Sequence, residues 1–211
     1  MLQPPVFRED RIEIMHDMMH KNPFASLISM QEGDIVADHI PLVIHPELSA
    51  KGNLRGHITL GNPIVKNLDH TTEVLVMFRG PHHYITPSWY PSKKEHDKVV
   101  PTWNYIMVHA RGKVKLHKNA DWILAHLTEL TRRNEKGRDE PWEVSDAPSD
   151  FIKRQLRAIV GIEIEISSLQ GIWKTSQNKT LEDNKGVCEG LKKESSTEAS
   201  VMVTCVEKTR N

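Results

Sequence analysis

The feature that most constrains the fold is a series of β-prone runs that helices interrupt at irregular intervals. Runs that favour strands occupy residues 24–30, 35–44, 54–60, 72–80, 99–117 and 160–178. In the last run Ile162, Ile164 and Ile166 alternate with glutamates, so we expect one buried face and one wet face. Helices do not follow each strand in turn, which argues against a parallel βαβ fold. The sequence predicts an α+β, mainly β domain: an antiparallel barrel or sheet with peripheral helices.

Helical periodicity is clearest over residues 119–135, where Asn119 or Asp121 can cap a run with an apolar side. Further helices are predicted over 7–22, 63–68 and 149–159, with Ser149 as a candidate cap. Beyond Asn178 two short amphipathic helices are expected. We therefore predict a domain over residues 1–178 and a C-terminal helical extension over 179–211 that packs on it, with its last residues frayed.

Charge and cysteine content narrow the class of protein. Lys+Arg and Asp+Glu both number 28, so the chain lacks the basic excess that phosphate contacts usually require, and direct DNA binding has no support from charge. The N-terminus does not have the pattern of a secretory signal, and no run approaches the about 18 apolar residues of a membrane span. Cys188 and Cys205 do not form a C-x-x-C pair. We expect a soluble protein of the reducing cytoplasm.

Aromatic rings, histidines and prolines are unusually dense between Phe78 and His109. Flat apolar rings with polar tips suit a pocket wall, and the same residues equally suit an edge strand with aromatic core packing. The adjacent His82 and His83 face opposite sides of an extended strand, so they do not make a metal site. The motifs of common hydrolases and nucleotide-binding loops are missing, and we predict neither a catalytic residue nor a metal.

A second dense stretch, WKTSQN over residues 173–178, follows the last predicted strand. Lys174 offers a point charge suited to a phosphate or an electron-rich ring, and Ser176, Gln177 and Asn178 can donate hydrogen bonds. An ordinary turn at the end of a strand remains the alternative interpretation of this stretch.

Three segments together resemble a known family: FRGPHHYITPSWY (78–90), VPTWNYIMVH (100–109) and GIEIEISSLQGIWKTSQN (161–178). With HIPLVI (39–44) and RGHI (55–58), they look like the PaiB family, described as FMN-binding negative transcriptional regulators. The resemblance extends to about Leu191. It implies an antiparallel six-stranded split β-barrel of the FMN-binding type with peripheral helices, a homodimer, and flavin sites at the dimer interface.

The resemblance also implies which residues contact FMN. Arg55 or Arg79 and Lys174 can serve the phosphate, and the aromatic strands can supply an apolar wall for the ring system. Carried over by position, the predicted pocket residues are His39, Leu42, Gly56, His57, Ser88, Trp89, Tyr90, Trp103, Asn104, Tyr105, Lys174, Ser176 and Gln177.

The function that the resemblance implies is negative regulation of sporulation and of degradative enzyme synthesis, including proteases. Two alternatives stay open, because the same barrel hosts them: a flavin-dependent oxidoreductase and a haem-binding protein. Neither DNA contact nor turnover follows from the residues themselves.

Overall fold

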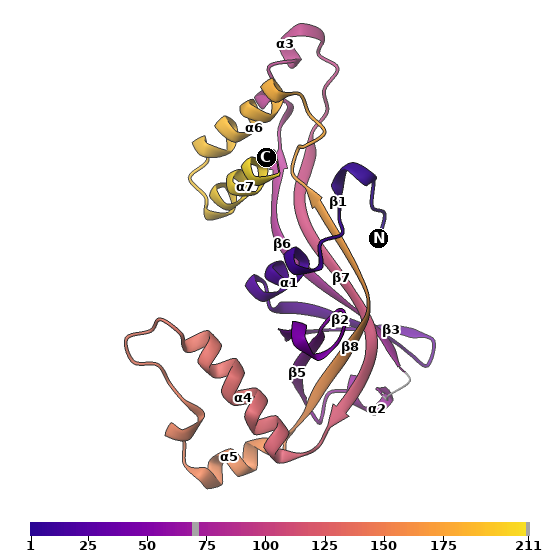
Figure 1. Ribbon diagram of the computed structural model, residues 1–211, viewed down its shortest axis with the longest axis vertical. Helices are drawn as coiled ribbons and strands as arrows, with labels where there is room; N and C mark the ends of the chain where they lie inside the picture. Colours follow the sequence, from indigo (N-terminus) through magenta and orange to yellow (C-terminus); the bar gives the residue numbers. More distant parts are fainter. Residues whose placement is uncertain (69–71, 210–211) are drawn as a thin grey trace. The chain divides into compact units, whose positions relative to one another are not determined.

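A computed structural model describes residues 1–68 and 72–209 of the chain, and a single antiparallel sheet is its main feature (Figure 1). The sheet has eight strands in the order β3-β2-β6-β7-β8-β5-β4, with β1 paired to β8. The strands are β1 (Arg8–Glu9), β2 (Phe24–Gln31), β3 (Asp34–Pro41), β4 (Val43–His45), β5 (Asn53–Thr59), β6 (Glu73–Ile85), β7 (Thr102–His117) and β8 (Ile159–Lys174).

The prediction of an α+β fold with an antiparallel sheet is confirmed, whereas the prediction of a six-stranded barrel is wrong. Among the described residues the strand order runs from β3 to β4 without a pairing that joins these two ends, so the sheet is open. The two additional strands are short: β1 has two residues and β4 has three. Segments of two or three residues are too short to show an alternating pattern in the sequence. Only their pairing with β8 and β5 identifies them as strands.

Seven α-helices lie in the described part of the chain. They are α1 (Ile12–Lys21), α2 (Ile64–Asn67), α3 (Lys93–His96), α4 (Ala120–Glu135), α5 (Ser149–Leu156), α6 (Leu181–Lys193) and α7 (Thr197–Lys208). Short 3₁₀ helices occur at η1 (Pro5–Phe7), η2 (Pro46–Leu48), η3 (Pro87–Trp89) and η4 (Val144–Asp146). None of the described helices is long and apolar enough to span a membrane.

Several predicted helix boundaries change. The helix expected over 7–22 begins only at Ile12, because Arg8 and Glu9 pair with β8 instead. The cap of α4 is Asn119, whose side chain accepts a hydrogen bond from the Trp122 amide at 2.9 Å. Ser149 is the first residue of α5 rather than its cap. Of the predicted frayed end, residues 210–211 lie outside the described residues.

The chain forms two compact units, each assembled from separate segments. Unit 1 comprises Met1–Met18, Arg79–Val108 and Gln170–Asn211, and unit 2 comprises Met19–Phe78 and His109–Leu169. Strands β6, β7 and β8 contribute residues to both units. The predicted boundary after residue 178 stays a prediction.

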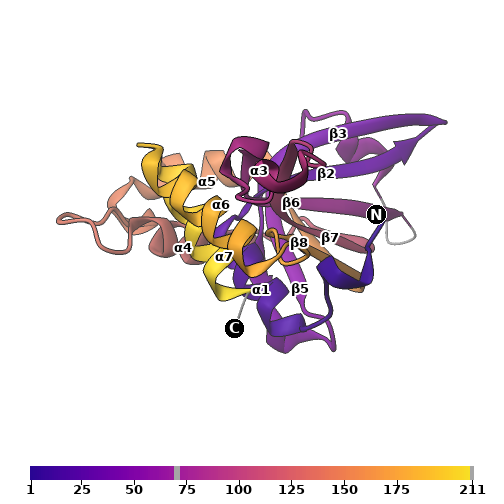
Figure 2. The same ribbon diagram turned by 90° about the horizontal axis from the view of Figure 1, so that it is seen from above.

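Unit 1 packs helices against the distal halves of the long strands. Met15 of α1 lies against Gly171, and Met18 lies against Gly80, where an added Cβ would come within 2.9 and 3.2 Å of these side chains. The hairpin of α6 and α7 packs on η3, and the two helices lie side by side (Figures 1 and 2). The contacts of the α6–α7 hairpin determine where several predicted site residues lie.

Unit 2 holds the β2–β3 hairpin and the core of the sheet. The hairpin closes at Glu32 and Gly33, both with positive φ, and β2 pairs with β6 only over residues 75–77. Pro81 lies beyond this paired stretch, so β6 continues through a proline that sequence patterning treats as its boundary. Leu27, Leu54 and Val76 are fully buried in the core of this unit.

Candidate functional site

An exposed group of aromatic rings lies on β6 and β7 in unit 1. We call it the aromatic face: His82, Tyr84, Trp103 and Tyr105. The indole of Trp103 stacks on His82 at 6.1 Å between ring centroids and meets Tyr84 edge-on at 6.0 Å. Trp103 is 52% exposed and Tyr84 is 44% exposed, so the rings are open to a partner or ligand. Such a surface can take a flat heteroaromatic ring by stacking.

The ammonium group of Lys174 lies beside the aromatic face, at the end of β8. Its Nζ donates to Thr102 Oγ1 at 2.5 Å and lies 5.8 Å from the centre of the Tyr105 ring. Burial, together with the positive charge of Lys179, lowers the pKa of Lys174. A partly desolvated ammonium next to open rings suits a ligand that combines an aromatic system with negative charge.

The turn after β8 holds the predicted residues Ser176 and Gln177, and Asn104 of β7 reaches it; the polar groups of all three bind the chain itself. The Asn104 amide and the Ser176 hydroxyl exchange hydrogen bonds of 2.9 and 3.1 Å, and both side chains are buried. Gln177 Oε1 accepts from the Thr175 amide at 2.7 Å. Ser176 has a φ of 66°, which this network supports. In this structure these three residues shape the turn that carries Lys174.

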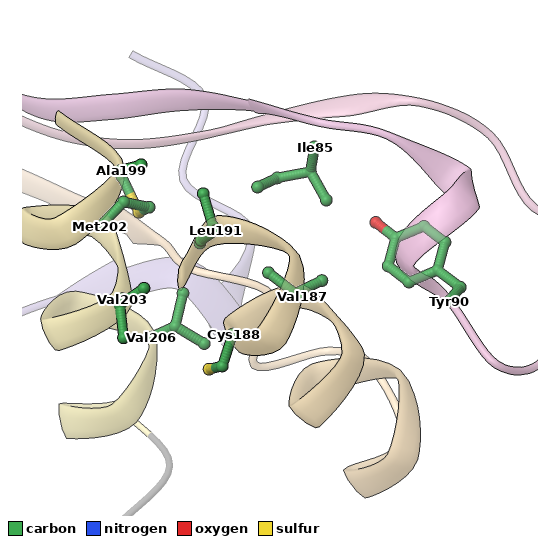
Figure 3. Packing of buried hydrophobic residues seen from close by; sticks show 9 residues of the cluster. All are labelled: Ile85, Tyr90, Val187, Cys188, Leu191, Ala199, Met202, Val203 and Val206. Atoms are coloured by element: carbon green, nitrogen blue, oxygen red, sulfur yellow. The ribbon is translucent and has the colours of Figure 1, made fainter. Parts of the chain in front are cut away.

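Ser88 and Trp89 of η3 and Tyr90, its C-cap, occupy three different environments. Ser88 is exposed. Trp89 lies on a small-residue face of α6, where a Cβ added to Gly190 would approach its indole to 2.2 Å. Tyr90 is 2% exposed inside a cluster with the C-terminal helices (Figure 3). Burial raises the pKa of Tyr90, with Asp183 adding to the effect.

We call this group the C-terminal cluster, and its members come from β6, the C-cap of η3, α6 and α7 (Figure 3). It consists of Ile85, Tyr90, Val187, Cys188, Leu191, Ala199, Met202, Val203 and Val206. Trp89 and Tyr90 therefore pack inside unit 1, whereas Trp103 is exposed; that the 78–109 stretch forms a ligand wall stays a prediction.

The remaining predicted pocket residues belong to unit 2. The His39 side chain is exposed and its Nδ1 lies 3.0 Å from the Ser26 hydroxyl. Leu42 is buried, and its side chain would lie 2.6 Å from a Cβ added to Gly56. His57 pairs with a histidine of α4. That all thirteen predicted residues contact FMN stays a prediction, since they divide between the two units.

A stack of rings between α4 and the sheet of unit 2 is a feature that sequence patterning misses. We call it the histidine stack: His117, Trp122, His126 and His57. Their successive ring centroids lie 4.1, 5.8 and 5.4 Å apart. His57 Nδ1 lies 3.3 Å from His126 Nε2, and Trp122 lies on Gly161. The Trp122–His126 spacing, one helical turn, is the signal that indicates a shared face.

Burial disfavours protonation of the three imidazoles in the histidine stack. It lowers the pKa of His126 from its ordinary 6.5 to about 4, and it lowers the pKa of His57 and of His117 as well. Arg55, a candidate for phosphate binding, instead pairs with Glu163 at 2.7 Å. Within the described residues no group of three or more His, Cys, Asp or Glu side chains is arranged to hold a metal. The ring contacts of the stack attach α4 to the sheet of unit 2.

Comparisons with known proteins agree with the family resemblance that the sequence segments indicate. Residues 1–168 match the sequence profile of the family described as "Putative FMN-binding domain". The chain is 31% identical to "Protease synthase and sporulation protein PAI 2" of Bacillus subtilis, over 97% of this chain and 95% of that protein. It is 34% identical to an uncharacterized protein of Emericella nidulans, over 88% of each.

Among solved structures, the FAD and haem binding protein of Mycobacterium smegmatis has a TM-score of 0.61 at 16% identity, covering 87% of this chain and 80% of that one. The flavocytochrome Anf3 of Azotobacter vinelandii has a TM-score of 0.58 at 10% identity, covering 79% and 69%. At these identities the likeness is one of fold. The sequence matches establish more: the chain belongs to the PaiB family of FMN-binding-type domains, together with PAI 2 of Bacillus subtilis.

Proposed function

We propose that the chain is a flavin-binding regulator that holds FMN on the aromatic face, with Lys174 beside it. The observation that carries this proposal is the pairing of open rings with a partly desolvated ammonium in a family of FMN-binding type. The isoalloxazine would stack on Trp103, and Lys174 would face the negative charge of the phosphate or of the reduced ring. Thr102 and the Ser176 turn hold that ammonium in place.

The proposal includes a homodimer. The exposed apolar rings of Trp103 and Tyr84 are the kind of surface that a second copy covers, and flavin sites at a dimer interface are what the family resemblance implies. Sedimentation equilibrium of the full chain should give twice the monomer mass of 24.2 kDa. A single species at the monomer mass across micromolar concentrations would rule out the dimer.

The proposed regulatory role is PaiB-like: a negative effect on sporulation and on protease synthesis, exerted in the cytoplasm. It is supported by the similarity to PAI 2, whose name refers to protease synthase and sporulation. A balanced charge of 28 basic and 28 acidic residues favours an indirect route over operator binding. A low-salt gel shift with promoter DNA should therefore show no complex, while deletion of the gene should raise secreted protease activity.

FMN titration, followed by visible absorbance and flavin fluorescence, tests the site. We expect saturable binding that Lys174→Met weakens about tenfold, because about 1.4 kcal/mol of charge interaction is lost. Lys193→Met, a change at an exposed lysine of α6, is the matched control and should bind as the parent does. Absence of binding at high micromolar FMN, or equal affinities of the two variants, would sink the proposed site.

A flavin-dependent oxidoreductase is the second candidate, because an open aromatic face leaves room for a second reactant beside a bound flavin. Two solved proteins of this fold are named as flavin or flavin-and-haem proteins. Anaerobic mixing of the FMN-loaded protein with reduced nicotinamide separates the candidates: bleaching of the flavin supports the enzyme, and an unchanged spectrum supports the regulator. Haem titration addresses the third candidate, which requires a Soret band that one histidine substitution abolishes.

A further inference from the structure

A crevice of about 380 Å³ lies between α4 and α5 in unit 2. This volume falls at the lower end of the roughly 300–1,000 Å³ that small-molecule pockets occupy. Figure 1 shows the two helices and the long connection that joins them. The lining comes from α4, from η4 with the residues that cap it, and from α5, and it includes Leu124, Arg132, Glu143, Ile152, Lys153 and Leu156.

The α4 wall of the crevice is a single stripe. Leu124, Thr128 and Arg132 are spaced four residues apart, so they lie on one face of the helix. The opposite side of α4 carries its two fully buried residues, Ile123 and His126. Helix α4 is thus attached to the sheet by one side and presents the crevice stripe on another.

The α5 wall is an apolar face that the described chain leaves incompletely covered. Ile152 and Leu156 are one helical turn apart and both line the crevice, yet none of the eight residues of α5 is buried. A helix of this length is marginal without packing, because only a few hydrogen bonds offset the cost of its nucleation. The apolar side chains that line the crevice therefore gain stability from an occupant.

The charges at the rim define the chemistry of that occupant. Arg132 and Lys153 lie on the two walls, and Glu143 is the single carboxylate that lines the crevice. Glu143 is shared: it lies 3.7 Å from the Arg132 guanidinium and accepts hydrogen bonds in the capping box of η4. Lys153 makes no ion pair within the described residues, whereas Arg154 pairs with Asp150. The rim therefore carries an excess of one positive charge.

We propose that this crevice binds a small monoanionic amphiphile, with its apolar chain or ring between Leu124, Ile152 and Leu156 and its carboxylate between Arg132 and Lys153. The two cations at the rim attract the carboxylate of the ligand, and the apolar walls contact its chain or ring. Because the crevice lies entirely within unit 2, this proposal does not depend on flavin binding.

Octanoate is a suitable probe, and octylammonium and octan-1-ol are comparison ligands of equal chain length. Titration of the flavin-free full chain, followed by ¹H–¹⁵N spectra, should show saturable shifts confined to residues 124–156. Octan-1-ol should bind more weakly than octanoate, and octylammonium should not saturate. Equal binding of all three, or shifts centred elsewhere, would overturn the proposal.

Variants locate the two parts of the ligand. The double change Arg132→Glu and Lys153→Glu should weaken octanoate at least about tenfold, since it removes both attractive charges and replaces them with repulsive ones. Lys136→Glu, a single charge reversal at the end of α4 and outside the lining of the crevice, should leave affinity unchanged. Leu156→Asp should abolish binding with an unchanged circular dichroism spectrum. A different outcome would be a protein that does not bind octanoate and a dimer that dissociates when Leu156 is changed to Asp. That result would show that a second copy covers the crevice, and it would overturn the proposal.

Discussion

In unit 1 the α6–α7 hairpin is attached by the C-terminal cluster and by Asp183, which accepts hydrogen bonds from the amide and hydroxyl of Ser92, whereas in unit 2 the α4 helix is attached by rings that can take up protons. The C-terminal cluster is built of aliphatic residues, Tyr90 and Cys188. The histidine stack consists of three imidazoles and one indole, and Trp122 and His126 are the two rings that α4 contributes. The buried residues of α4 are Ile123 and His126. Apolar burial is insensitive to pH, so the two attachments should fail under different conditions.

The largest effect is expected from filling the surface of α6 that receives Trp89. A Cβ at Gly190 would lie 2.2 Å from the rigid indole, so Gly190→Leu forces the hairpin away from η3. We expect a loss of about 3 kcal/mol in the free energy of unfolding, measured with urea. Gly61→Ala is the matched control, because a Cβ there meets open space. Equal midpoints for the two variants would contradict the packing of Trp89.

Acid should destabilise the histidine stack that attaches α4. The pKa of folded His126 is about 4, below its ordinary 6.5, so its contribution to stability is complete above pH 6.5 and is lost as the pH falls toward 4. The loss amounts to about 2 to 3 kcal/mol. Arg55 and the imidazoles of His57 and His45 add unfavourable charge to the protonated form.

Urea midpoints between pH 7 and 4 measure this loss. His126→Phe keeps a ring in the stack and removes the proton site, so its stability should fall less steeply with acid than that of the parent. A parent and variant with the same slope would show that His126 is not the group that titrates.

The turn that carries Lys174 should show an intermediate effect. Asn104→Ala leaves the buried Ser176 hydroxyl without its amide partner, which costs about 2 kcal/mol of stability and loosens the turn. FMN affinity should fall with it if the turn positions Lys174. Asn178→Ala, a change at the exposed end of the same motif, should alter neither quantity by a measurable amount.

The smallest effect concerns the start of α4. Asn119→Ala removes the cap that accepts from the Trp122 amide and should cost about 1 kcal/mol, while Asn119→Asp should keep the stability of the parent. Thermal unfolding of the three proteins provides the comparison. If the alanine and aspartate variants unfold together, the cap does not contribute.

Local patterns predicted the parts of the fold that depend on neighbours in sequence. The alternation around Ile164 predicted β8, and Asn119 predicted the start of α4. Composition also predicted that aromatic residues would gather near Trp103, where the structure places an open face.

Contacts between distant segments were beyond those patterns. Sequence patterning predicts Trp89 in a ligand wall, and it gives no sign that Trp89 packs on Gly186 and Gly190, because these lie about a hundred residues later. The histidine stack likewise joins His57 of β5 to His126 of α4. Periodicity describes each element by itself, and these contacts depend on which elements meet.

Hydrogen exchange of the full chain with and without FMN tests the central claim most directly, since it reports which region holds the ligand. The proposed site predicts slower exchange in peptides that cover residues 82–84, 102–105 and 174–177, and unchanged exchange in α4. Protection confined to α4 and residues around His57, with no change at Trp103 or Lys174, would contradict the assignment of the aromatic face as the flavin site.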